Sequence, residues 1–301
     1  MINRRNFAST AMLALSSCSI AATTVKAGAA PTPAEHDEIA AHLRRIERSS
    51  RGRLGVHILD TATGAEFGHR ADERFLMCST FKLLASALVL RRADRGEESL
   101  ARRIAFARSD LVPHSPVTEK HTGGAGMTLA ELCDAAMTTS DNTAANLILA
   151  SYGGPPAVTA FARTLGDTVT RLDRFEPALN DWHDERDTTS PRAMLHSMRQ
   201  LTLGDALAPA SRELLRRWLR ANTTGGARLK AGLPPEWQIG DKTGSGDATS
   251  NDIAVVWPPG RAPLLVTAYL TRSRVSFEAR NAVLAQVGRL LPLIAAGPMP
   301  R

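Results

Sequence analysis

Ser79 and Lys82 lie one helical turn apart in an otherwise apolar run, LMCSTFKLLA, at residues 76–85. Burying an ammonium group without a partner is costly and lowers its pKa. Lysine is also rare here, with five lysines against thirty-two arginines, and only the amine has a pKa that a protein readily shifts. A hydroxyl and an amine at this spacing near a helix N-terminus suit a nucleophile and its base. Alone the pattern is weak, because a capped helix with a surface-reaching lysine looks the same.

Two polar motifs follow in the middle of the chain. The sequence SDN at residues 140–142 comes at the end of an expected helix, where it is typical of a polar turn. The sequence EPALN places Glu176 and Asn180 in a charge-rich loop, and such loops are usually solvated. Neither motif indicates a site by itself.

The fourth motif, DKTGSG, spans residues 241–246 and contains Lys242. It follows the start of an expected strand, where Gly244 and Gly246 would let the backbone approach a ligand closely. The alternative is an ordinary turn at the end of that strand.

The motifs S-x-x-K, S-D-N and K-T-G in this order are the set found in class A β-lactamases and penicillin-binding proteins. Glu176 and Asn180 add the deacylation element of the lactamases. The chain therefore resembles a class A serine β-lactamase, and the resemblance covers residues 34–295.

The resemblance implies a role for each catalytic residue. Ser79 would open the four-membered lactam ring to give an acyl-enzyme, with Lys82, or Glu176 through a water molecule, as its base. Ser140 would pass a proton to the departing ring nitrogen. Glu176 and Asn180 would activate the water that releases the product acid.

The resemblance also implies a set of substrate-binding residues. They are Asn142, Asn180, Arg228, Lys242, Thr243, Gly244 and Ser245. The backbone N–H groups of Ser79 and Ser245 would hold the oxyanion. Many relatives place a carboxylate-binding arginine on the strand after K-T-G, where this sequence has none. Arg228 matches the alternative position that some relatives use, so the resemblance implies this role for Arg228. Asn142 would hydrogen-bond the side-chain amide of the substrate.

Some positions depart from the family pattern. The loop after Asn180 is short, which leaves an ion pair between Arg174 and Asp187 open. His114 occupies a cleft-edge position where many relatives have tyrosine.

The elements expected around the motifs indicate an α/β (α+β) fold. Residues 34–49 read as a helix, RLGVHILD and AEFGHR as an antiparallel hairpin, and DIAVVW and PLLVTAYL as strands covered on both faces. An apolar repeat from Ser276 predicts a C-terminal helix. We expect an antiparallel sheet flanked by the terminal helices in an α/β lobe, residues 28–71 and 211–301, with an inserted all-α lobe, residues 72–210. The active site would lie in the cleft between them.

The first 27 residues read as an export signal. Arg4 and Arg5 precede an apolar segment, and small residues near Ala27 offer a cleavage site. The arginine pair favours the twin-arginine route to the periplasm over an ordinary secretory signal. A lipid anchor through Cys18 is the less favoured alternative.

Composition excludes several partners and cofactors. The net charge of +7 includes three basic residues of the leader, the other basic residues are scattered, and aromatic residues are only 5%, so a nucleic-acid surface is not indicated. Cys78 and Cys133 are the cysteines beyond the leader, and we expect two buried free thiols. Histidine spacing does not suit zinc, and we expect no cofactor, no protein partner and a monomer.

The predicted function is hydrolysis of the β-lactam ring of penicillins, and of cephalosporins, as Ser245 and Asp247 suggest, with resistance to these drugs as the result. One alternative is a D-alanyl-D-alanine carboxypeptidase or transpeptidase, which shares the serine and lysines but does not need Glu176. Another is a β-lactam sensor that is acylated without turnover. Fold alone does not separate the three.

Overall fold

The structure is a computed structural model that describes residues 32–182 and 184–296. The predicted leader lies outside the described residues. The main helices are α1 (Pro33–Ser50), α2 (Lys82–Asp94), α3 (Leu129–Thr138), α4 (Asn142–Ser151), α5 (Pro155–Thr164), α6 (Pro191–Thr202), α7 (Pro209–Arg220), α8 (Phe277–Gly288) and α9 (Leu290–Ala296). Single 3₁₀ turns are η1 (Cys78–Phe81), η2 (Arg108–Asp110), η3 (Thr118–Lys120), η4 (Ala178–Asn180) and η5 (Leu229–Gly232).

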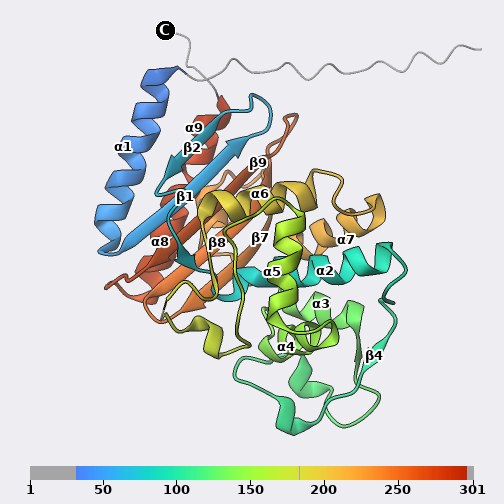
Figure 1. The fold of residues 1–301 in the computed structure, drawn as a ribbon. Helices are drawn as coiled ribbons and strands as arrows, with labels where there is room; N and C mark the ends of the chain where they lie inside the picture. The colour runs from blue at the N-terminus through green and yellow to red at the C-terminus, as the bar shows by residue number, and fades with distance from the viewer. Residues whose placement is uncertain (1–31, 183, 297–301) are drawn as a thin grey trace, which may run out of the picture.

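A five-stranded antiparallel sheet holds the two ends of the chain together. Its strands are β1 (Arg53–Asp60), β2 (Glu66–His69), β7 (Gln238–Gly246), β8 (Thr249–Trp257) and β9 (Leu264–Thr271). They lie in the order β2-β1-β9-β8-β7, so β1 near the N-terminus pairs with β9 near the C-terminus (Figure 1). Two small ladders pair β3 (Phe75–Leu76) with β6 (Thr188–Thr189) and β4 (Arg103–Ile104) with β5 (Met127–Thr128).

Both faces of this sheet are buried, as the continuous apolar strands predict. Alternate strand residues contribute to different cores, since successive side chains point to opposite faces. Val256 and Val266 pack with α1, α8 and α9, whereas Val255 and Leu265 pack with the helical cluster α2 to α7. The expected antiparallel sheet flanked by terminal helices is confirmed.

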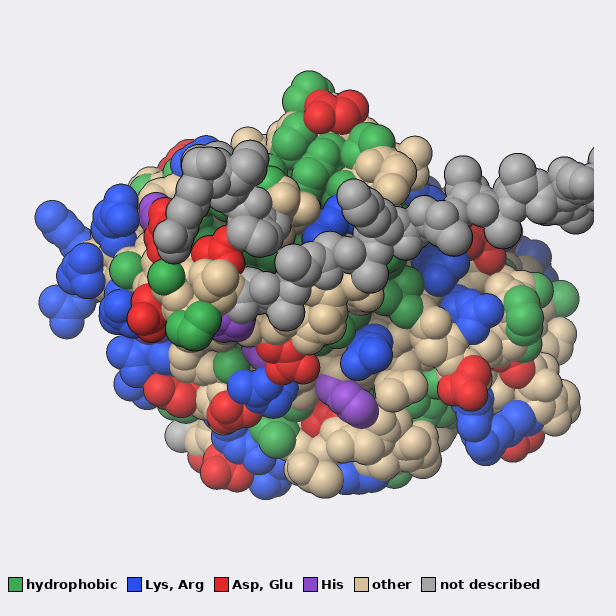
Figure 2. All heavy atoms as spheres, turned by 90° about the horizontal axis from the view of Figure 1, so that it is seen from above, with side chains coloured by type: hydrophobic (Ala, Val, Ile, Leu, Met, Phe, Trp, Pro, Cys, Tyr) green, Lys and Arg blue, Asp and Glu red, His purple; other side chains and the backbone are tan. Residues whose placement is uncertain are grey.

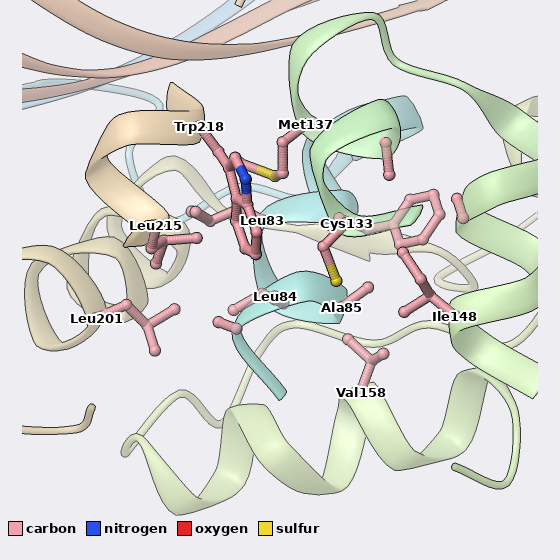
Figure 3. Close-up of a cluster of buried hydrophobic side chains, with 14 of the residues drawn as sticks. Leu83, Leu84, Ala85, Cys133, Met137, Ile148, Val158, Leu201, Leu215 and Trp218 are labelled. Atoms are coloured by element: carbon pink, nitrogen blue, oxygen red, sulfur yellow. The ribbon is translucent and has the colours of Figure 1, made fainter. Parts of the chain in front are cut away.

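The helical cluster is organised around α2. Figure 3 shows Leu83 and Leu84 of α2 among side chains from α3, α4, α5, α6 and α7, including Trp218. The proposed boundary at residue 211 falls inside α7, and Trp218 packs in this helical core. The division into two lobes stays a prediction.

Local sequence signals account for most helix ends. Thr128 and Glu131 form the capping box expected at the start of α3, and a second box at Thr32 and Glu35 opens α1. The helical tail expected from Ser276 is confirmed, but it is divided at Arg289 into α8 and α9. Pro292 in the first turn of α9 lacks the N–H that would continue α8.

The surface carries charges of both signs. On the face shown in Figure 2, acidic side chains lie among the basic ones. Within residues 32–182 and 184–296, no helix has the length and apolar character needed to cross a bilayer.

Candidate active site

The candidate active site is a cleft of about 310 Å³ between β7 and the helical cluster. Its lining residues are Ser79, His114, Ser140, Asn142, Asn180, Thr224, Arg228, Thr243, Ser245 and Phe277. Seven predicted site residues therefore share one cleft, and the bonds described below connect Lys82, Glu176, Lys242 and Gly244 to it.

Ser79 and Lys82 meet at the start of α2. Ser79 lies in the single turn η1, not in the α-helix itself, and Lys82 is the first residue of α2. The Nζ of Lys82 donates to the Oγ of Ser79 at 2.9 Å, to the carbonyl of Ser140 at 2.8 Å and to the Oδ1 of Asn142 at 2.6 Å. Burial lowers the pKa of Lys82, and the carboxylate of Glu176 opposes that shift.

Glu176 faces the same hydroxyl from the opposite loop. The Oγ of Ser79 donates to Oε1 of Glu176 at 3.3 Å, and Lys82 Nζ lies 3.3 Å from the same oxygen. The Nδ2 of Asn180 donates to the other carboxylate oxygen at 2.5 Å. A nucleophile, an amine and a carboxylate are thus within hydrogen-bond reach of one another.

Asn146 fixes the backbone of Glu176 and was missed by sequence reasoning. Its Oδ1 accepts from the Glu176 N–H and its Nδ2 donates to the Glu176 carbonyl, both at 2.9 Å. Asn146 lies four residues after Asn142 on the apolar helix α4, but this position carries no sign of a partner thirty residues away.

The ion pair left open by the short loop is present. The Nε of Arg174 donates to the carboxylate of Asp187 at 2.6 Å, and the Asp187 side chain is completely buried. The other carboxylate oxygen accepts the backbone N–H groups of Asp173 and Arg174 at 2.8 and 3.0 Å. Asp187 therefore connects the two ends of the loop that carries Glu176.

Ser140 lies between the two lysines. Its Oγ accepts from Lys242 Nζ at 3.0 Å and from Lys82 Nζ at 3.4 Å. Its backbone has a φ of 62°, a left-handed conformation that turns the chain between α3 and α4. Asp141 caps α4 by accepting from the Ala144 N–H at 2.8 Å. Burial lowers the pKa of Lys242 far below its usual value, and the charge of Lys82 adds to this shift.

Gly244 and Gly246 pack closely against the turn η1. The motif lies within β7, paired to β8, and is not a turn. A Cβ on Gly244 would lie 2.7 Å from the carbonyl of Met77, and one on Gly246 would lie 3.1 Å from Sγ of Cys78. These glycines let β7 approach the turn that holds the nucleophile, and close approach of a ligand to this backbone stays a prediction.

Arg228 is buried with its guanidinium directed at the cleft. Its Nη2 donates to the Oγ of Ser245 at 2.6 Å, and its Nη1 donates to the carbonyl of Gly244 at 2.9 Å. Its Nε donates to Oδ1 of Asn281 in α8 at 2.9 Å, a partner that no sequence motif indicated. Thr243 is hydrogen-bonded to Thr224, another lining residue that sequence reasoning missed.

β7 and β8 each carry a buried carboxyl group, Asp241 and Asp252 respectively. Burial raises the pKa of Asp241 and, further, that of Asp252, where the charge of Asp241 contributes. Each acid lies within a strand whose residues are mostly buried.

Both cysteines of the described chain are free and buried, as expected. Burial raises the pKa of the Cys133 thiol to about 12. In residues 32–182 and 184–296, no group of three or more His, Cys, Asp and Glu is arranged to hold a metal ion.

The sequence model of the "Beta-lactamase enzyme family" matches residues 38–293. The chain is 50% identical over 267 residues to β-lactamase CTX-M-8 of Citrobacter amalonaticus, covering 88% of this chain and 91% of the relative. It is 50% identical over 268 residues to β-lactamase L2 of Stenotrophomonas maltophilia, covering 88% of each. A solved class A ancestral β-lactamase (GNCA) matches at 60% identity with a TM-score of 0.84, over 85% of this chain and 99% of that one. The putative class A β-lactamase PenP from Rhodopseudomonas palustris matches at 60% identity with a TM-score of 0.84, over 86% of this chain and 100% of that one. The chain belongs to the class A β-lactamase family.

Proposed function

We propose that this protein hydrolyses penicillins and cephalosporins through an acyl-enzyme on Ser79, and so confers resistance to these drugs. One observation supports this above all. The Oγ of Ser79 lies 2.9 Å from the amine of Lys82 and 3.3 Å from the carboxylate of Glu176. The hydroxyl that would capture the substrate is therefore in contact with an amine that can act as its base and with a carboxylate that can activate water for release of the product.

In acylation, the Oγ of Ser79 attacks the lactam carbonyl carbon and its proton passes to Lys82, or to Glu176 through water. The carbonyl oxygen becomes an oxyanion between the backbone N–H groups of Ser79 and Ser245. The carbonyl re-forms as the C–N bond breaks, the ring nitrogen takes a proton from Ser140, and Ser140 regains a proton from Lys82, whose Nζ lies 3.4 Å from its Oγ. Lys242, 3.0 Å from the Oγ of Ser140, holds that hydroxyl in place.

In deacylation, a water molecule attacks the ester carbonyl carbon while Glu176 accepts its proton. The ester bond breaks, and the proton returns to the Oγ of Ser79 as the product acid leaves. Asn180, bonded to Glu176 at 2.5 Å, would orient the carboxylate and the water.

The binding roles follow the same geometry. Arg228, Thr243 and Ser245 line the end of the cleft where an anionic carboxylate would be held by charge-assisted hydrogen bonds. Asn142 also lines this cleft, and we place the acylamino side chain of the substrate beside it.

The position of Glu176 favours a hydrolase over the two alternatives. A D-alanyl-D-alanine peptidase shares Ser79, Lys82, Ser140 and Lys242 but has no need for a carboxylate at the nucleophile. A sensor that stays acylated needs no water-activating group either.

The test is steady-state turnover of benzylpenicillin by the purified chain that follows residue 27. We expect many turnovers per enzyme, measured as loss of the β-lactam absorbance. A stoichiometric burst without further turnover would favour the sensor. Release of D-alanine from a muropeptide, with no penicillin turnover, would favour the peptidase.

We also propose that the leader exports the protein to the periplasm by the twin-arginine route and that it acts there as a monomer. Replacing Arg4 and Arg5 by lysine should retain the protein in the cytoplasm, as measured by cell fractionation. A Cys18→Ser variant should be exported without change, whereas loss of membrane attachment in that variant would favour a lipid anchor. Size-exclusion chromatography of the mature protein checks the monomer.

A further inference from the structure

Phe277 is an exposed aromatic residue in the candidate active site. It is the first residue of α8, and it lines the same cleft as Ser79 and Ser245. Its relative exposure is 45%, although it is large and apolar. None of the catalytic or binding roles assigned above uses this ring, so its exposure requires another explanation.

Two guanidinium groups lie over the Phe277 ring. The Cζ atoms of Arg228 and Arg280 are 5.7 and 5.8 Å from its centroid. Arg280 donates to the Oγ of Ser250 at 3.3 Å, and Arg228 donates to the Oγ of Ser245 at 2.6 Å, so hydrogen bonds hold both cations. The apolar ring therefore lies close to two positive charges.

The acid nearest in sequence offsets only part of this charge. Glu278 follows Phe277 in the first turn of α8 and is exposed to solvent. An anionic aromatic group resting on Phe277 would therefore meet two cations fixed by the protein and one solvated carboxylate.

The connectivity of a cephalosporin brings its C3 substituent to this ring. The C4 atom carries the carboxylate, which the proposed function places beside Arg228 and Ser245. C3 is bonded directly to C4, so its substituent leaves the ring system next to that pocket. The matching end of a penicillin carries only two methyl groups, which cannot stack.

We propose that Phe277 is a specificity-determining residue that stacks on planar aromatic C3 substituents, and that Arg228 and Arg280 make this position favour anionic over cationic groups. The proposal rests on the hydrolysis of cephalosporins described above. It deepens that function by naming which members of the substrate class bind best.

Cefotaxime and ceftriaxone provide a matched pair of probes. They share one acylamino side chain, but cefotaxime has an acetoxymethyl group at C3 and ceftriaxone has a planar, acidic triazine heterocycle. Each drug is used as a competitor of benzylpenicillin hydrolysis, so that an apparent Kd is obtained even if its own turnover is slow. Phe277→Ala should raise the apparent Kd of ceftriaxone about threefold to tenfold and that of cefotaxime by less than about twofold.

Two further substitutions at the same residue separate stacking from simple apolar contact. Phe277→Tyr keeps the ring and should keep the preference for ceftriaxone. Phe277→Leu keeps an apolar side chain without the ring and should lose most of it. If the Phe277→Leu variant and the unmodified enzyme bind ceftriaxone with equal affinity, the stacking role is overturned.

Cephalothin and cephaloridine test the charge preference. They share a thienylacetyl side chain, but cephaloridine carries a pyridinium cation at C3. Arg280→Gln should lower the apparent Kd of cephaloridine and raise that of ceftriaxone, each by about twofold to fivefold. The apparent Kd of cephalothin should change little. Changes in the same direction for both charged drugs would reject the electrostatic part of the proposal.

The control is Leu293→Ala, which removes a 55% exposed apolar side chain from α9. It should leave all four competitors unchanged. The urea midpoint of every Phe277 variant should stay close to that of the unmodified enzyme, which shows that the protein still folds. If Phe277→Ala weakens both members of the cefotaxime pair equally, or neither, the inference fails. If the unmodified enzyme does not turn over benzylpenicillin, it is the proposed function that fails.

Discussion

The Nζ of Lys82 and the Oε1 of Glu176 lie 3.3 Å apart, and both side chains are completely buried. Each group therefore supplies the counter-charge that makes burial of the other tolerable. The Oγ of Ser79 contacts both of them. A substitution at any one of the three changes the electrostatics of the other two, so single variants need readouts that separate acylation from deacylation.

Glu176→Ala should trap the acyl-enzyme. The variant retains Ser79 and Lys82 but loses the carboxylate that would activate water, so we expect turnover to fall about 10²–10⁴-fold. Mass spectrometry after mixing with benzylpenicillin should show a stable addition of one opened drug on Ser79. Fast single-turnover acylation in this variant would assign Lys82 as the base, whereas equally slow acylation would assign Glu176.

Glu185→Ala is the matched control for that experiment. Glu185 belongs to the same loop, but 68% of its side chain is exposed, and its ion pair with Arg74 is long at 3.6 Å. Its turnover should stay near the unmodified rate. Unchanged turnover in Glu176→Ala would contradict the assigned base.

Asp187→Ala should loosen the loop that carries Glu176. It removes the acceptor of two backbone N–H groups and leaves the guanidinium of Arg174 without its partner. Loss of one partner of a buried pair costs about 3–5 kcal/mol of stability. We expect a lower midpoint in urea and a burst of acylation followed by slow deacylation.

Asp184→Ala provides the surface comparison. Asp184 pairs with Arg186, and their side chains are 54% and 40% exposed, so its loss should leave the urea midpoint nearly unchanged. Equal destabilisation by the two variants would show that burial of Asp187 does not matter.

Arg228→Lys should weaken binding of the substrate carboxylate. The guanidinium bonds Gly244, Ser245 and Asn281 at once, and a single ammonium cannot reproduce that geometry. We expect KM for benzylpenicillin to rise about tenfold to hundredfold.

The methyl ester of benzylpenicillin checks whether the carboxylate is the group that is recognised. The unmodified enzyme should bind the ester poorly, and Arg228→Lys should weaken it little further. A loss as large for the ester as for the acid would mean that the substitution acts through the fold.

The catalytic groups could be predicted from sequence because each lies in a short motif of chemically distinctive residues. Ser79 and Lys82 are three residues apart, and their contact is set by one local turn. Asn146 and Asn281 could not be found this way, because they act through contacts with residues 30 and 53 positions away. A single polar residue on a helix carries no sign of such a distant partner.

The C-terminal half of β7 was the least predictable part of the sheet. D-K-T-G-S-G has the glycines of a turn, yet it forms regular pairs with β8. The glycines are required by contact with Met77 and Cys78, which are more than 160 residues away in sequence. Tertiary packing therefore outweighed the local preference of glycine. The apolar strands were predictable because burial on both faces leaves a continuous hydrophobic run.

Asp252→Asn should change how stability depends on pH. Burial and the charge of Asp241 raise the pKa of Asp252 well above its usual value, so the folded protein keeps a proton that the unfolded chain releases above about pH 4. The stabilisation from this proton is complete below the unfolded pKa and is lost as pH rises through the folded pKa. The asparagine variant does not titrate there, so it should gain stability relative to the unmodified protein by about 1.4 kcal/mol per pH unit across that window. Urea unfolding at pH 5 and pH 6 measures the difference.

Asp247→Asn, at an exposed position after K-T-G, should show no such trend. An identical difference at both pH values for Asp252→Asn would mean that Asp252 is already ionised in the folded protein at pH 5.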